Sequence, residues 1–276
     1  MFDFVISQGV TLADKWILSR FGEVVESATK KLETYEFSQA GEELRDFTWS
    51  EFADWYLEIA KIQKENGQAQ STDQILLYIL ERLLVMWHPF MPFVTEEIYK
   101  LFETDQMLIV QDWPCSEIKK DKKATEQFDQ LKEIITTLRT IRSEYKIAPK
   151  ILMQAQIVGD LADDLSDSQE IIKKMARLEM LELSDKADKP PGAVSAVVGS
   201  LKLYVPLSGL VDLTREKERL SKDLKETQNY LDGMDKKLSN QAFVKKAPKE
   251  IVAELKQKQE EADQKLQTIK QQLADL

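Results

Sequence analysis

The 276-residue sequence is poor in cysteine, histidine, glycine and proline. Its single cysteine, Cys115, excludes an internal disulfide framework and cysteine-cluster metal sites, and fits a reducing intracellular compartment. Its single histidine, His88, excludes sites built from several imidazoles. Only 9 glycines and 8 prolines favour helices over a loop-rich β protein. No apolar run approaches the roughly 20 residues of a membrane helix, and the start lacks the basic region of a secretory signal. We therefore expect a soluble, cytoplasmic chain that has no membrane partner.

Positive charge is also in deficit, since the formal net charge is −10. Residues 1–211 carry a net charge of −11, whereas residues 212–276 hold 14 Lys and Arg against 13 Asp and Glu. Composition alone therefore argues mildly against polyanion binding. Any nucleic-acid contact has to rest on local basic patches.

Apolar residues recur at three- and four-residue steps from about residue 11 to 148, which is typical of amphipathic helices. The last of these helices is expected from Ala124 to Tyr145, with Pro149 just beyond it. Candidate boundaries are Thr11 and Asp14 as N-caps, Asn66-Gly67 as a break, and Ser71, Thr72 and Asp73 as caps of the following helix. We interpret residues 1–149 as an α-helical bundle.

Two further regions follow the bundle. Residues 150–210 alternate short strands with one helix, expected from Leu165 to Leu178, and so predict a small α/β connector. Residues 211–276 carry two heptad-like apolar seams separated by a turn that contains Pro248. Because each apolar seam must pack against a partner to be removed from water, the two seams predict an antiparallel coiled-coil hairpin. The fold class is therefore mainly α.

Local sequences in the bundle resemble the anticodon-binding region of class I aminoacyl-tRNA synthetases for valine, isoleucine and leucine. They are Asp14-Lys15-Trp16-Ile17-Leu18-Ser19-Arg20, the stretch from Phe47 to Glu58, and the stretch from His88 to Tyr99. Tail sequences resemble the terminal coiled coil of valyl-tRNA synthetases: Val205 to Leu213 at its beginning, and Leu238-Ser239-Asn240 with Lys246-Ala247-Pro248 at its turn. The chain is thus similar to the C-terminal region of that family along essentially its whole length.

The resemblance implies a tRNA-holding part of a valine–tRNA ligase, with the catalytic portion on a preceding N-terminal segment. A HIGH-type loop needs two histidines, and this sequence has only one. It also contains neither a KMSKS-type lysine-serine loop nor a glycine-rich phosphate cradle. We therefore expect this chain to be inactive alone and to hold no cofactor, with ATP and Mg belonging to the complete enzyme. The implied partner is valine-specific tRNA, not DNA, and a monomer is expected.

Candidate tRNA-binding residues follow from helical spacing of basic side chains and from the resemblance. In the bundle they are Arg139, Arg142 and Lys146, interpreted as one helical face, and Trp49, for which packing in the core is the alternative to stacking on an anticodon base. In the arm they are Arg215, Arg219, Lys222, Lys245, Lys246 and Lys249, for which pairing with neighbouring acids is the alternative. No catalytic, cofactor-binding or metal-binding residue is assigned.

Two rival functions stay open at this point. One is the same module of an isoleucyl- or leucyl-tRNA synthetase, against which the terminal coiled coil argues. The other is a non-enzymatic coiled-coil module that binds another protein.

Overall fold

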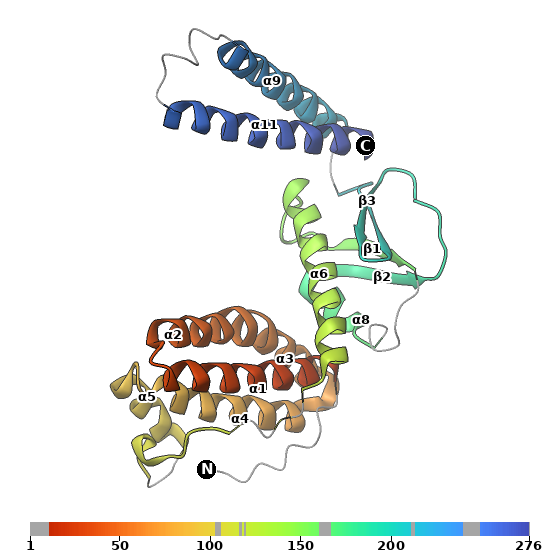
Figure 1. The fold of residues 1–276 in the computed structure, drawn as a ribbon. Coiled ribbons are helices and arrows are strands. Elements are labelled where there is room, and N and C mark those ends of the chain that lie inside the picture. Colours follow the sequence, from red (N-terminus) through yellow and green to blue (C-terminus); the bar gives the residue numbers. More distant parts are fainter. Residues whose placement is uncertain are drawn as a thin grey trace. The chain divides into compact units, whose positions relative to one another are not determined.

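The structure, a computed structural model, describes residues 11–102, 106–115, 118, 120–159, 167–210, 213–239 and 249–275. The chain divides into two compact units, Met1–Thr136 with Leu161–Ala176, and Thr137–Asp160 with Arg177–Leu276. The described residues are mostly helical and include one small mixed sheet (Figure 1). The mainly α class is thus confirmed, whereas the division at residues 149 and 210 stays a prediction.

The first unit is a bundle of helices around an aromatic core. Trp16, Phe21, Phe47, Tyr56 and Phe128 are all fully buried, and the rings of Trp16 and Phe128 stack with centroids 3.9 Å apart. The elements are α1 (Leu12–Glu33), α2 (Phe37–Asp46), the π-helix η1 (Phe47–Leu57), α3 (Glu58–Gln63), η2 (Lys64–Gln68), α4 (Ala69–Trp87), α5 (Pro92–Tyr99), the short η3 (Lys100–Phe102) and η4 (Leu108–Val110), the first part of α6 (Lys122–Glu144), and α8 (Gln169–Ala176). The longer helices each bury one apolar face, as the spacing predicts.

Helix boundaries test the predicted capping residues. Thr11 is the N-cap of α1, and Asp14 completes a capping box with it, so the two candidates act together. Gly67 has a φ of 86° and breaks the helical run as expected. The predicted caps at residues 71–73 are wrong, because α4 already begins at Ala69. Thr72 is buried within α4 and donates to Gln63 Oε1 at 3.3 Å instead.

The second unit contains the end of α6, the sheet and two long helices. The strands are β1 (Met153–Val158), β2 (Leu178–Ser184), β3 (Ala193–Val198) and β4 (Leu201–Pro206), in the order β2-β1-β4-β3. β1 pairs parallel with β2, and the other two pairings are antiparallel. The predicted α/β composition of this region is confirmed, but the helix expected to reach Leu178 ends at Ala176, and Leu178 begins β2 instead.

The long helices are α9 (Leu213–Ser239) and α11 (Lys249–Asp275), which pack along their apolar seams. Leu231 forms a buried cluster with Ala262 and Leu266, and Gln259 donates to Asp235 across the two helices. Six of the expected seam positions are buried, namely Leu220, Leu231, Met234, Ala262, Leu266 and Ile269. In the described ranges no helix is long and apolar enough to cross a membrane.

Candidate nucleic-acid interface

A groove of about 360 Å³ lies on the first unit between α1 and the run formed by α2 and η1. It is lined by Arg20, Val24, Lys31, Gln39, Glu42, Glu43, Asp46, Phe47 and Glu51. Four carboxylates against two cations make the lining acidic. Such a groove repels phosphate but offers many acceptors to amino groups.

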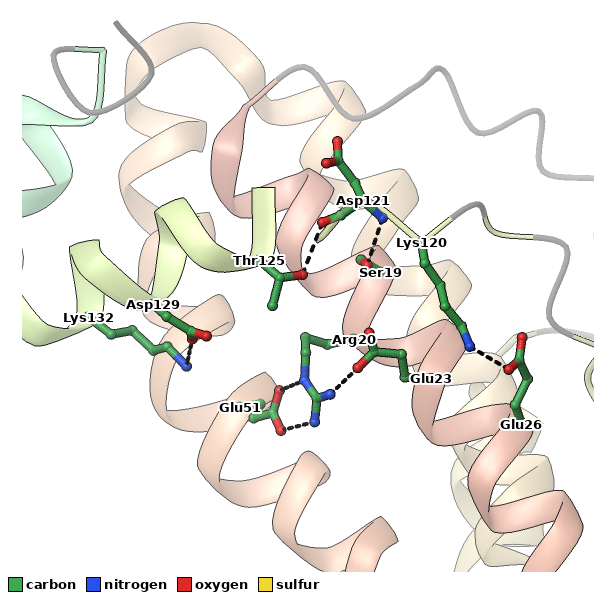
Figure 2. Close-up of polar contacts among 10 residues, drawn as sticks. All are labelled: Ser19, Arg20, Glu23, Glu26, Glu51, Lys120, Asp121, Thr125, Asp129 and Lys132. Carbon is green, nitrogen blue, oxygen red and sulfur yellow. Dashed lines mark hydrogen bonds and ion pairs between the residues drawn. The ribbon is translucent and has the colours of Figure 1, made fainter. Parts of the chain in front are cut away.

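The two cations of the groove are held by carboxylates of its own walls. Arg20 binds Glu51 in a bidentate pair, with Nε to Oε2 at 2.8 Å and Nη2 to Oε1 at 2.9 Å, and also contacts Glu23 (Figure 2). The hydrogen bond to Glu51 is the main cause that raises the pKa of Arg20. Lys31 pairs with Glu43 at 2.8 Å. These pairs fix the walls, because the bidentate geometry allows little rotation of either side chain.

One carboxylate of the lining stands apart from these pairs. Glu42 is exposed and, within the described part of the chain, has no ion pair. Asp46 pairs with Arg45 at 2.9 Å, with both side chains largely in water. Glu42 is therefore the groove carboxylate that is least engaged by a cation of the protein itself.

Contacts between the start of α6 and α1 stabilise the part of the bundle next to the groove. The backbone N–H of Asp121 donates to Ser19 Oγ at 3.0 Å, and Lys120 pairs with Glu26 at 2.5 Å (Figure 2). Lys132 pairs with Asp129 at 2.7 Å and lies over the ring of Trp16. Lys120 and Lys132 therefore stabilise the bundle itself.

Trp49 does not lie in the core. Its side chain is 55% exposed, and its ring packs edge-on against Trp87 with centroids 6.2 Å apart. Trp87 is itself fixed, since its Nε1–H donates to Thr48 Oγ1 at 3.0 Å. The packing alternative is thus wrong for Trp49, and a supported aromatic face is available for stacking. Trp49 is not among the groove residues.

The predicted basic face of α6 is not one helical face. α6 ends at Glu144, and Lys146 lies beyond it with a φ of 50°. The N–H of Lys146 bonds to Ser143 O and that of Ile147 to Arg142 O, the pattern of a Schellman motif. Arg139 is exposed on the helix, whereas Arg142 is half-buried and donates to backbone carbonyls. The expected tRNA contact by these residues stays a prediction.

The arm residues are only partly described. Arg219 pairs with Asp223 at 2.6 Å, and Lys222 with Glu226 at 3.9 Å, as the pairing alternative requires. Arg215 and Lys249 lie near the starts of α9 and α11, while Lys245 and Lys246 lie outside the described residues. Pairs with i,i+4 spacing on a helix contribute only about 0.3–0.5 kcal/mol each, and the side chains of Lys222 and Glu226 are both largely exposed.

Comparison with known families defines the class of this chain. Residues 14–157 match the anticodon-binding domain of tRNA ligases, and the chain belongs to that family. Its last part, residues 212–276, matches the valyl tRNA synthetase tRNA binding arm. The chain thus matches an anticodon-binding domain followed by a valyl-type tRNA binding arm, in the order that the motifs predicted.

Relatives agree with the domain matches. The chain is 33% identical over 277 residues to a valine–tRNA ligase of Syntrophotalea carbinolica and 34% identical over 282 residues to that of Staphylococcus carnosus. It is 31% identical to the chloroplastic/mitochondrial valine–tRNA ligase 2 of Arabidopsis thaliana. These alignments cover 97%, 99% and 95% of this chain but 31%, 32% and 28% of the relatives. The chain spans about a third of the length of the curated relatives it matches.

Sequence reasoning missed the groove. Arg20 and Glu51 both stand in motifs that carried the resemblance, but they are 31 positions apart. Only the packing of α1 against η1 shows that they pair. The signal available in the sequence was a basic residue and an acidic residue, each at the inward edge of a predicted helix.

Proposed function

We propose that this chain binds valine-specific tRNA as a monomer, with the helical bundle at the anticodon and the long helices as a tRNA-contacting arm. The family matches over residues 14–157 and 212–276 carry the proposal. Attachment of valine, with ATP and Mg, would belong to the part of the relatives that this chain does not match. This chain would supply recognition and positioning in the cytoplasm, without catalysis or a cofactor of its own.

The arm is proposed to be an antiparallel coiled-coil hairpin. Leu231 opposite Ala262 and Leu266, and Asp235 opposite Gln259, fit helices that run in opposite directions. A stiff hairpin reaches a distant RNA surface, and a few lysines and arginines on it give a grip that is salt-dependent and tolerant of sequence.

The groove is proposed to accept anticodon bases rather than phosphates. Adenine and cytosine both carry exocyclic amino donors on their base edges. A carboxylate accepts from the amino group of cytosine, and Glu42 has no ion pair in the described structure. Base reading in unpaired loops works through such edge contacts and through stacking.

The first experiment is a titration of the chain with valine tRNA and a non-cognate tRNA across a salt series. Preference for valine tRNA, with affinity that falls steeply as salt rises, is the expected result. Equal affinity for both tRNAs would contradict valine recognition. Binding to neither tRNA at low salt, together with self-association through the seams, would favour the protein-interaction module instead.

A second titration tests the groove. Replacing an anticodon cytosine of valine tRNA with uracil removes one amino donor and should weaken binding by about 1–3 kcal/mol, or roughly fivefold to a hundredfold. Glu42→Gln should reduce this discrimination, whereas Glu33→Gln, an exposed carboxylate on α1 outside the groove, should retain it. Unchanged discrimination in Glu42→Gln would exclude that residue as the reader. An isoleucyl or leucyl module would instead prefer its own tRNA over valine tRNA in the first titration.

A further inference from the structure

The second unit concentrates cations at the turn that follows α6. Residues 142–150 and 177–179 contain Arg142, Lys146, Lys150 and Arg177 against Glu144 and Glu179, a local surplus of two positive charges on an acidic chain. Lys146, Lys150 and Arg177 are exposed. None of these three forms an ion pair with any carboxylate that the structure describes. This group of four is called the turn cluster.

The turn cluster is built around the guanidinium of Arg142. Its Nη1 donates to the carbonyl oxygens of Ile151 at 2.7 Å and Ala148 at 3.3 Å, and its Nη2 donates to that of Arg177 at 2.8 Å. Arg177 in turn donates from Nη1 to Pro149 O at 3.0 Å. Both guanidinium groups are thus positioned by neutral backbone carbonyls. These hydrogen bonds fix the orientation of both groups at the turn.

Two members of the turn cluster occupy backbone positions that suit glycine better. Lys146 has a φ of 50° and Arg177 a φ of 55°, and the only other non-glycine residue with positive φ in the described ranges is Tyr35. Side chains other than glycine, asparagine and aspartate rarely adopt this conformation, because the Cβ approaches the following carbonyl. Strained positions of this kind cluster where a site requires the side chain.

We propose that Lys146, Lys150 and Arg177, arranged around Arg142 at the turn after α6, form a phosphate-binding surface for the backbone of the bound RNA. The proposal rests on tRNA binding as the function, and adds a binding surface outside the acidic groove and the arm. Arg142 acts here as a positioning residue that holds the turn and the carbonyl of Arg177. Desolvation, and then the nearby charge of Arg177, lowers the pKa of Arg142, which agrees with two cations placed close together. An RNA phosphate would relieve that repulsion.

The glycine preference of position 146 gives a test that separates binding from folding. Lys146→Gly removes a charge where glycine fits the backbone, so the unfolding midpoint should stay equal or rise. The double variant Lys146→Gly with Lys150→Gln should bind valine tRNA on the order of tenfold more weakly at low salt, since each phosphate that it no longer neutralises retains its counterions. The slope of log affinity against log salt should become shallower by about 1 for each of these phosphates.

The control is Lys202→Gln, which removes one exposed lysine from β4 in the same unit. It should change neither the affinity nor the slope. Affinity and slope equal to those of the unchanged chain in the double variant would overturn the turn cluster as an RNA-binding surface while leaving tRNA binding in place. A shallower slope without any preference for valine tRNA would support the cluster and contradict valine recognition. No RNA binding by the unchanged chain would overturn both.

Discussion

The hydroxyl of Tyr56 donates a 2.7 Å hydrogen bond to the carboxylate of Asp14, and both side chains are buried. The same carboxylate accepts from Gln63 Nε2 at 3.1 Å. Asp14 also belongs to the capping box of α1. One buried acid thus ties the start of α1 to η1 and α3, and it is stabilised only if its donors remain in place.

Tyr56→Phe should destabilise the bundle, because it removes one donor from a buried carboxylate while filling nearly the same volume. A hydrogen bond to a charged group contributes about 1.5–3 kcal/mol to the free energy of unfolding. Urea denaturation, followed by tryptophan fluorescence, measures the loss. Tyr35→Phe is the matched control, since Tyr35 is 80% exposed. A loss as small as that of the control would contradict a structural role for the pair.

Alkaline pH should reduce the difference between the unchanged chain and Tyr56→Phe. Burial, then the charge of Asp14, raises the pKa of Tyr56 above its ordinary value. The contribution of this tyrosine is therefore complete below the unfolded-state pKa of about 10. Above it the unfolded state releases its proton first, so the free energy of unfolding falls by up to about 1.4 kcal/mol per pH unit.

Denaturation from about pH 8 to about pH 11 tests this sign, given the ordinary tyrosine pKa of about 10. The difference between the unchanged chain and Tyr56→Phe should shrink as the pH rises past 10. A difference that grows with pH would show that the phenol is stabilised in its ionised form, contrary to its contact with a carboxylate.

Arg142→Gln should destabilise the turn after α6. The substitution removes bonds to the carbonyls of Ile151 and Arg177, and the loss should be about 2 kcal/mol because the donor is charged. Hydrogen exchange of the Met153 amide, which bonds to Arg177 O at 3.2 Å, should accelerate. Lys123→Gln, which replaces an exposed lysine near the start of the same helix, should change neither quantity. Unaltered exchange at Met153 in Arg142→Gln would contradict the positioning role.

Periodic features could be predicted from the sequence, because they depend on neighbours a few positions apart. The seams of α9 and α11 and the inward face of α1 belong to this group: Leu220, Leu231 and Leu266 are buried as their spacing requires. Thr11 was also recognisable, since a capping box needs only four consecutive positions.

Features that depend on tertiary register could not be predicted. The pairing of Arg20 with Glu51 requires knowing which turns of two helices lie opposite each other. Lys146 was expected on a face of α6, because only the backbone conformation shows that the helix ends two residues earlier. It ends there in a motif where glycine is usual. Thr72 carried a capping composition, yet a buried bond to Gln63 decides its role. The candidate site was therefore only partly predictable.

Trp49→Leu should weaken tRNA binding with little effect on stability. The exposed indole packs on Trp87 by its edge, and removal of a stacking aromatic costs about 1–3 kcal/mol per base. Phe93→Leu on α5 is the matched control, because Phe93 is 86% exposed and also lies in the bundle. Both variants should unfold at nearly the same midpoint as the unchanged chain. Titration with valine tRNA should show a loss of roughly fivefold to a hundredfold for Trp49→Leu, following the same stacking free energy, and none for Phe93→Leu. Equal affinities for the two variants would mean that Trp49 only packs against Trp87, and that the anticodon bases stack elsewhere on the bundle.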